Sequence, residues 1–249
     1  KFGLPDEAAA KAAVQAIEAT QFSARAVEKK RVKRHPYTPF TTSTLQQEAS
    51  RKLGFGATQT MRVAQRLYEG VELEGETVGL ITYMRTDSVT LGRDAVEALR
   101  AMVNREFGRS YLPDAPRMYQ TKAKNAQEAH EAIRPTDPMR RPQDLTRHLG
   151  EDERRLYELI WRRSMAAQME SALLDQTAVD LAGPDGKVIL RATGTVVAFD
   201  GFLKLYREDR DDSTDEDGDD RRLPDINEGE KTPRDSVSRR SKSAGTVTL

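Results

Sequence analysis

The chain has 249 residues, of which 37% are hydrophobic and 32% are charged, enough for one large domain or two modest ones with a limited core and long solvated segments. Its 40 basic residues balance its 40 acidic residues, so the net charge does not by itself indicate a polyanionic partner. The absence of cysteine excludes disulfides and thiolate metal sites. No run of about 18 apolar residues and no signal-peptide pattern occurs. Because the chain opens at Lys1 in mid-pattern, we expect it to be part of a longer polypeptide.

The first 40 residues predict a helix, a strand and a linker. Residues 5–19 are alanine-rich with acidic residues in the first turn, which favours a helix. Residues 21–32 alternate apolar and polar side chains and predict a half-buried strand. Residues 33–40 contain two prolines and are typical of an irregular linker. The basic run 28–35 is compatible with a DNA backbone contact or with a solvated strand edge.

Two short helices are predicted next, separated by the glycine-containing turn GFGA. The first, 42–54, has Ser43 as its expected N-cap and ends at Gly54. The second, 58–70, begins at Thr58 and carries one apolar stripe. That stripe is Met61, Ala64, Leu67 and Tyr68. Two helices joined in this way, followed by strands, predict a winged helix-turn-helix.

The segment GLITYMRTDS, residues 79–88, predicts a buried strand that leads into a polar loop. On a strand, Tyr83 and Arg85 project to the same face because they are two residues apart. A phenol can attack a phosphodiester if a nearby cation or base activates it, and a guanidinium can stabilise the developing oxyanion. The alternative is an ordinary strand aromatic with an arginine extending past it.

The remaining elements are three helices and two strands. The helices are expected over 90–108, capped near Thr90, over 126–135, broken by Pro135, and over 150–169. In the last helix the residues expected to face inward are Leu156, Leu159, Ile160 and Trp161. The strands are expected over 175–183 and 187–206, joined by the turn GPDG. The acidic run 208–220 lacks the spacing of a calcium loop and is expected to be a solvated insertion.

Three strings in a fixed order resemble the type IA DNA topoisomerase family, its bacterial members in particular. They are PFTTSTLQQEASRKLGFGATQTMRVAQRLYEG (39–70), GLITYMRTDS (79–88) and AQEAHEAIRPT (126–136). The resemblance covers about residues 37–206. It departs from the family at the longer stretch between Tyr68 and Gly79. It departs again at 231–249, which we expect to be atypical or disordered.

The resemblance implies a role for each matching residue. Tyr83 would attack single-stranded DNA to form a 5′-phosphotyrosine and release a 3′-hydroxyl, and Arg85 would contact the scissile phosphate. His130 would lie near that phosphate. Thr82 and Asp87 would shape the site, and Gln65 would lie near the DNA path. The reaction relaxes negatively supercoiled DNA without ATP.

The resemblance also implies partners outside this sequence. Family members bind Mg²⁺ through a Toprim domain and close their torus with a further domain, and nothing here resembles either. We therefore expect the chain alone to bind no metal and to be inactive, with single-stranded DNA as its preferred partner and a cytoplasmic, nucleoid-associated location. The rival hypothesis is a non-enzymatic winged-helix module that binds duplex DNA.

The expected fold class is α+β. A mainly helical winged-helix-like domain, 37–170, would be inserted into a β hinge domain formed by 1–36 and 171–206. Residues 207–249 would form an acidic, flexible segment and tail.

Overall fold

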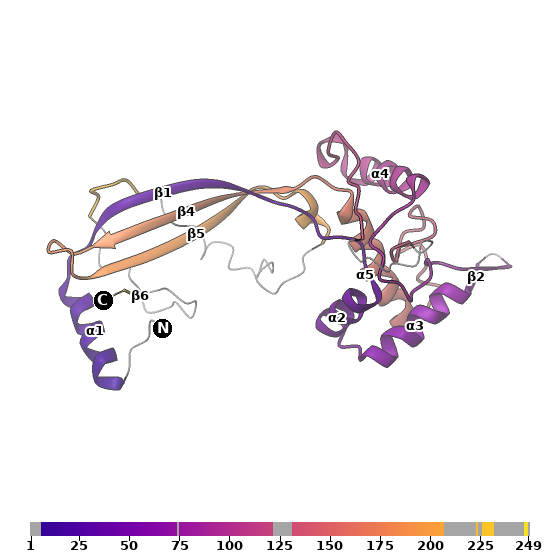
Figure 1. The fold of residues 1–249 in the computed structure, drawn as a ribbon, viewed down its shortest axis with the longest axis horizontal. Coiled ribbons are helices and arrows are strands. Elements are labelled where there is room, and N and C mark those ends of the chain that lie inside the picture. The colour runs from indigo at the N-terminus through magenta and orange to yellow at the C-terminus, as the bar shows by residue number, and fades with distance from the viewer. Residues whose placement is uncertain are drawn as a thin grey trace. The chain divides into compact units, whose positions relative to one another are not determined.

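The computed structural model describes residues 6–73, 75–121, 131–206, 223 and 226–231, together with the backbone of 247–248. The chain divides into two compact units, each treated separately below (Figure 1). A sheet unit draws on residues 1–33, 173–199 and 214–249, and a helical unit on 34–172 and 200–213. Mixed helices and antiparallel strands place the chain in the predicted α+β class.

The sheet unit contains three long strands and a two-residue strand. Their order is β1 (Ser23–Arg34), β4 (Ala172–Ala182), β5 (Ile189–Phe199) and β6 (Val247–Thr248). Strands β4 and β5 are antiparallel, with Asp180 opposite Arg191, and β6 pairs with the start of β5. Helix α1 (Glu7–Ala19) precedes β1, and the Asp6 carboxylate accepts a hydrogen bond from the Ala9 amide to cap it.

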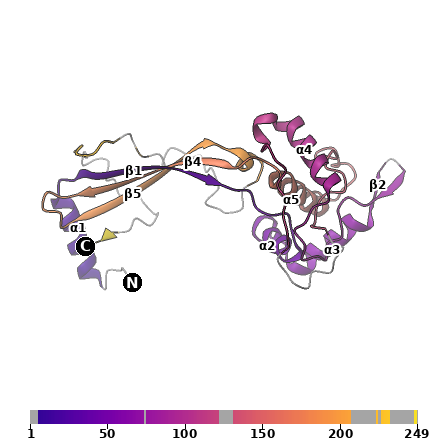
Figure 2. The ribbon, with the colours of Figure 1, turned by 45° about the horizontal axis from the view of Figure 1, so that its top comes forward.

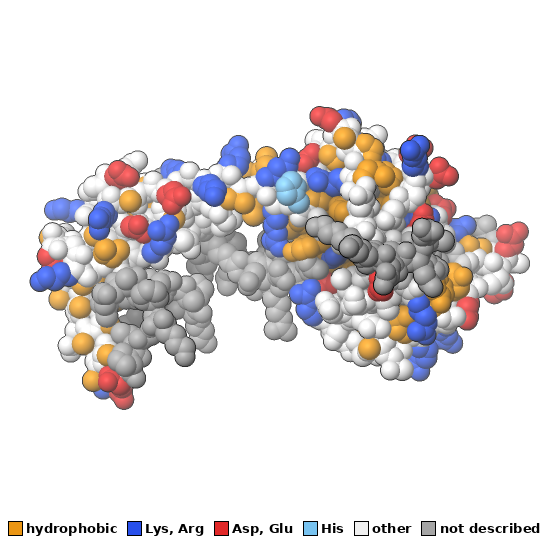
Figure 3. Space-filling view, in the orientation of Figure 1, with side chains coloured by type: hydrophobic (Ala, Val, Ile, Leu, Met, Phe, Trp, Pro, Cys, Tyr) orange, Lys and Arg blue, Asp and Glu red, His pale blue; other side chains and the backbone are white. Residues whose placement is uncertain are grey.

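The core of the sheet unit is small because the strands expose much of their length. Phe22, Ala24, Val179 and Leu181 form the buried cluster, against which Ile17 and Val27 pack. The basic run of β1 is interleaved with acids: Arg31 pairs with Asp175 at 2.7 Å, and Arg191 of β5 pairs with Glu28 at 3.4 Å. Figure 3 shows this alternation of Lys and Arg with Asp and Glu on the surface. The pairing favours the solvated-strand interpretation of residues 28–35.

The helical unit is built around its last helix. It comprises α2 (Thr42–Leu53), α3 (Ala57–Glu69), the hairpin β2 (Val71–Leu73) and β3 (Glu76–Val78), α4 (Arg93–Phe107), the 3-10 helix η1 (Arg109–Tyr111), α5 (Glu151–Ala167) and the 3-10 helix η2 (Gly201–Lys204). Helix α5 packs against α2, α3 and α4 (Figures 1 and 2). The α2–α3 pair followed by the β2–β3 hairpin has the winged helix-turn-helix arrangement predicted from sequence.

Helix α5 buries more than its apolar face. The four residues expected to face inward are buried, and the Trp161 indole donates a 2.8 Å hydrogen bond to the Pro138 carbonyl. Arg163 and Ser164 are also buried, although their residue types predict a solvated face. The helix is therefore surrounded by protein on most sides, and Arg163 needs internal hydrogen-bond partners.

Two helix starts differ from the sequence predictions, and a third lies close to its predicted cap. Helix α2 is capped by Thr41 rather than Ser43, because Thr41 and Thr44 exchange backbone-to-side-chain hydrogen bonds. Helix α3 begins after Gly56 rather than at Thr58. Helix α4 begins after Gly92, near its predicted cap at Thr90, and the carboxylate of Glu131, distant in sequence, accepts the Gly92 amide hydrogen bond at 2.8 Å.

The prediction that residues 79–88 begin as a strand is wrong, and so is the helix prediction for 126–135 over the described residues 131–135. Neither segment forms its predicted element, and their backbones pair only through isolated antiparallel bridges, Phe40 with Ile133 and Ile81 with Pro135. Residues 131–135 thus lie between two other segments of the chain. Their alanine, isoleucine and glutamate residues favour helix locally, but the backbone hydrogen bonds come from tertiary partners.

The predicted strand 187–206 ends at Phe199, because residues 200–206 turn into the helical unit. Gly201 has φ +50°, and a Cβ there would lie 2.6 Å from the Glu170 carbonyl oxygen. Only glycine fits this close turn. Because residues 200–206 belong to the helical unit, the predicted hinge segment 171–206 is too long at its end.

The predicted tail 207–249 is partly ordered in the sheet unit. The Ala24 amide donates to the Glu230 carbonyl, Ser23 bridges with Lys231, and β6 adds to β5. The acidic run 208–220 lies outside the described residues. Among the helices described, none is long and apolar enough to cross a membrane.

Candidate functional site

The segment that carries Tyr83 belongs to no sheet and bends at Thr82, Met84 and Arg85. Its side chains alternate: Tyr83, Arg85 and Asp87 are exposed, whereas Met84, Thr86 and Ser88 are buried. The hydroxyl of Thr42 donates to the Met84 carbonyl at 2.9 Å and accepts from the Thr86 amide at 2.8 Å. The start of α2 therefore holds this segment in place. The predicted common face of Tyr83 and Arg85 is present, although a side chain rather than a neighbouring strand maintains it.

Thr82 fixes the other side of the same segment. Its hydroxyl donates to the Ala132 carbonyl at 2.7 Å and accepts from the Arg134 amide at 3.0 Å. Its amide donates to the Arg134 carbonyl at 2.9 Å. These contacts bind the Tyr83 segment to residues 132–134. Thr82 thus has a positioning role in this structure, and its predicted contribution to DNA binding stays a prediction.

Tyr83 differs from most of the other tyrosines in its exposure. The hydroxyls of the buried or half-buried tyrosines form hydrogen bonds within the protein: Tyr119 with the Ala167 carbonyl, Tyr157 with the Arg140 carbonyl and Tyr206 with Glu48. Burial raises the pKa of Tyr119 to about 12, which keeps that phenol neutral at physiological pH. Tyr83, with 39% of its surface exposed, and Tyr68, with 41%, are the exposed tyrosines.

Helix α3 presents a polar and aromatic stripe to this segment. Met61, Gln65 and Tyr68 are spaced i, i+4, i+7 and share one face, offset by one residue from the buried face at Thr60, Val63, Ala64 and Leu67. The Tyr68 and Tyr83 rings meet edge to face, with centroids 5.4 Å apart and planes at 65°. The prediction that Tyr68 shares one apolar stripe with Ala64 and Leu67 is therefore wrong, because those two residues are buried whereas Tyr68 is exposed and contacts Tyr83.

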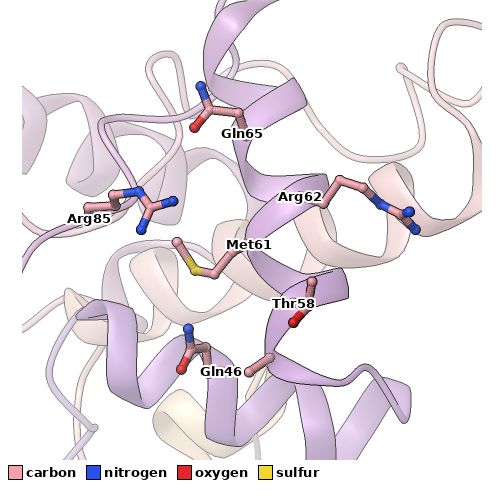
Figure 4. Close-up of a pocket in the computed structure, with 7 residues that line it drawn as sticks. Gln46, Thr58, Met61, Arg62, Gln65 and Arg85 are labelled. Atoms are coloured by element: carbon pink, nitrogen blue, oxygen red, sulfur yellow. The ribbon is translucent and has the colours of Figure 1, made fainter.

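An open pocket of about 550 Å³ lies beside Arg85 (Figure 4). Its lining residues are Gln46 from α2, Ala57, Thr58, Met61, Arg62 and Gln65 from α3, and Arg85. In Figure 4 the Arg85 guanidinium and the Met61 side chain point toward one another, with Gln46 below and Gln65 above. The structure thus joins Gln65 and Arg85, both singled out in the sequence, to Gln46, Met61 and Arg62, which sequence reasoning missed. The signal that could have found Met61 and Tyr68 is the i, i+7 spacing outside the buried stripe.

Of the remaining predicted site residues, the structure describes Asp87 but not His130. Asp87 is exposed on the face of Tyr83 and Arg85, two residues beyond the latter. His130 lies outside the described residues, but the next residue, Glu131, pairs with Arg134 at 2.6 Å and caps α4. Gln65 donates its amide to Glu69 within α3. No group of three or more His, Asp or Glu side chains in the described ranges is placed to hold a metal ion.

We expect Gly79→Ala to destabilise the helical unit by about 1–3 kcal/mol. An added Cβ would lie 2.7 Å from the Tyr68 carbonyl oxygen, and the next residue's amide, Leu80, donates to Leu67 at 2.7 Å, so the backbones cannot separate freely. The measurement is urea unfolding followed by the fluorescence of the single tryptophan, Trp161, in α5. Gly56→Ala is the matched control, because its φ is −69° and no atom lies within 4 Å of the added Cβ. Equal effects of the two substitutions would contradict the expectation.

The fold and the site define a protein of winged-helix type with an exposed tyrosine–arginine pair. A family model described as DNA topoisomerase matches residues 2–246. DNA topoisomerase 1 of Rickettsia bellii is 49% identical over 230 residues, which cover 92% of this chain and 28% of that protein. DNA topoisomerase 1 of Xylella fastidiosa is 50% identical over 232 residues, with coverages of 92% and 28%. The solved full-length topoisomerase I from Thermotoga maritima matches with a TM-score of 0.73 and 35% identity, covering 88% of this chain and 34% of that one.

The chain belongs to the DNA topoisomerase family. It spans less than a third of the length of the curated relatives described above. The family match extends well beyond the 37–206 range inferred from the sequence and includes most of the tail. The expectation that residues 231–249 depart from the family is therefore wrong over most of that range.

Proposed function

We propose that this chain supplies the tyrosine nucleophile of a type IA DNA topoisomerase. The observation that supports this most strongly is the exposed Tyr83–Arg85 pair, held by Thr42 and Thr82 beside a winged helix-turn-helix, in a chain of this family. An accessible phenol and a guanidinium on one face provide a nucleophile and a stabiliser of negative charge.

In the proposed reaction the Tyr83 oxygen attacks a phosphodiester of single-stranded DNA. The tyrosine–phosphorus bond forms as the bond from phosphorus to the 3′ oxygen breaks. Tyr83 gives up its phenolic proton in this step. The DNA 5′ end becomes a phosphotyrosine, and the leaving oxygen takes up one proton to become a 3′-hydroxyl, so one proton is lost and one is gained. Attack by that hydroxyl reverses the step. Because the bond energy is kept in the phosphotyrosine, passage of the other strand and religation need no ATP, and negative supercoils are removed.

The role of Arg85 is to bind the phosphate and the charge that develops on it. A guanidinium can form two parallel hydrogen bonds with phosphate oxygens. His130 is proposed to contact the same phosphate, and Asp87, Thr82 and Gln65 to border the DNA path. The Tyr68 ring would limit rotation of the Tyr83 ring through the edge-to-face contact.

We propose that the metal site and the domain that closes around DNA come from other parts of a longer polypeptide. Mg²⁺ would be held by a Toprim domain and would neutralise phosphate charge there. A further domain would close a torus around DNA. The 28% coverage of full-length relatives supports this division. We propose that the 249 residues alone neither bind the metal nor relax DNA, and that the whole protein acts at the nucleoid in the cytoplasm.

The test uses the full-length protein with negatively supercoiled plasmid. ATP-independent relaxation is expected, and denaturation during the reaction should trap a covalent adduct that peptide mapping assigns to Tyr83. The alternative, a non-enzymatic winged-helix module, is favoured by the α2–α3 pair and the β2–β3 hairpin. It predicts preferential duplex binding and no adduct. Robust relaxation by the 249-residue chain would contradict the proposed division of labour.

A further inference from the structure

The pocket beside Arg85 combines chemistry suited to a nucleotide. No carboxylate of the described residues pairs with Arg85, whose guanidinium points toward Met61, so it brings positive charge to the pocket, whereas the Arg62 guanidinium points away from Met61 and Arg85 (Figure 4). Met61 supplies an apolar, polarisable surface, and the amides of Gln46 and Gln65 supply hydrogen-bond donors and acceptors. A volume of about 550 Å³ lies within the range of small-ligand pockets.

We infer that this pocket binds the base of the nucleotide adjacent to the phosphate held by Arg85, within a single DNA strand. This inference rests on the proposed function and adds a specificity-determining subsite to it. The Met61 side chain would pack on the base, and Gln46 and Gln65 would contact its edge (Figure 4). A paired base in a duplex cannot enter the pocket without leaving its stack, which gives the site a preference for single strands.

Position in the fold supports this assignment. Met61 and Gln65 share the face of α3 with Tyr68, whose ring touches Tyr83. Residues that line the pocket and the residue that contacts Tyr83 therefore lie on one face of α3. Arg85 lines the same pocket and is two residues from Tyr83 in the chain. In the proposed arrangement, a strand whose phosphate contacts Arg85 and Tyr83 would place its neighbouring base beside Met61.

The test measures binding of short single-stranded oligonucleotides to the full-length protein carrying Tyr83→Phe, which prevents cleavage. Fluorescence anisotropy is recorded for a series in which one abasic site is moved through every position of one oligonucleotide, and any cleavage site of the wild-type protein is mapped separately on the intact oligonucleotide. We expect one position next to the scissile phosphate at which base removal weakens binding roughly tenfold, the size of one stacking contact.

Adding Met61→Ala is expected to weaken binding of intact DNA by the same factor and to abolish the abasic penalty at that position. Adding Met118→Ala, a substitution of an exposed methionine outside the pocket, should leave the penalty unchanged. The inference is overturned if no single position shows a penalty or if the penalty survives Met61→Ala. A Gln46→Ala variant with an unaltered fold should also shift the base composition found at that position among mapped cleavage sites.

The two proposals fail separately. A wild-type protein that forms no adduct, while the Met61-dependent penalty persists, would remove the nucleophile assignment and leave the base subsite. An adduct at Tyr83 without a Met61-dependent penalty would remove the base subsite and leave the nucleophile assignment.

Discussion

Tyr83→Phe in the full-length protein is expected to abolish the covalent DNA adduct and to lower relaxation activity by at least about four orders of magnitude, as loss of a nucleophile does in other covalent catalysts. The substitution removes one oxygen from a ring that is 39% exposed, so the fold should not change. Relaxation of supercoiled plasmid, adduct trapping and thermal unfolding are the three measurements.

Tyr68→Phe is the matched control for this experiment. Tyr68 is as exposed as Tyr83 and contacts it, but it lies on α3 rather than on the segment with Arg85. The control should retain adduct formation because the phenyl ring preserves the edge-to-face contact. If Tyr68→Phe lost the adduct and Tyr83→Phe kept it, the nucleophile would have to be reassigned to Tyr68.

Arg163→Met is expected to destabilise the helical unit by about 3–5 kcal/mol. The Arg163 side chain is almost completely buried in α5. Its Nε donates to the Thr38 carbonyl at 2.6 Å, and its Nη1 donates to the Tyr206 hydroxyl at 3.2 Å. Its guanidinium also lies 4.8 Å from the Phe40 ring centroid and 4.9 Å from that of Tyr37.

The loss would extend beyond one side chain. The Tyr206 hydroxyl donates to Glu48 at 2.7 Å, and Glu48, which is 1% exposed, also pairs with Arg51 and Lys52. Methionine fills similar space, but it removes the Arg163 donor from the Thr38 carbonyl. It also removes the hydrogen bond to the Tyr206 hydroxyl, which itself binds the buried Glu48 carboxylate. The segment before α2 and the segment after η2 are both anchored at this point.

Urea unfolding followed by Trp161 fluorescence measures the effect, because this single tryptophan is buried in the same helix. Arg162→Met is the matched control, since Arg162 is exposed and pairs with Glu158 on the helix surface. It should change stability by no more than about 0.5 kcal/mol. Similar losses in the two variants would show that the buried network around Arg163 contributes little.

Local sequence patterns predicted the helices of this chain well and its irregular segments poorly. The α5 pattern correctly indicated Leu156, Leu159, Ile160 and Trp161 as buried, because a 3.6-residue apolar period is a property of the helix itself. Residues 131–135 have helix-favouring neighbours, yet they lie between Phe40 and Ile81. Pairing with segments about 90 and 50 residues away leaves no local signal.

The sequence by itself determined the residue types of the candidate site, the helix-turn-helix and the α+β class. Each of these depends on neighbours within a few positions of the chain. Tertiary structure alone decided that Thr42 and Thr82 hold the Tyr83 segment, that Tyr68 faces Tyr83, and that Arg85 opens into a pocket with Gln46 and Met61. It also buried Arg163, because the Thr38 carbonyl, the Tyr206 hydroxyl and the neighbouring rings help to compensate its desolvated charge.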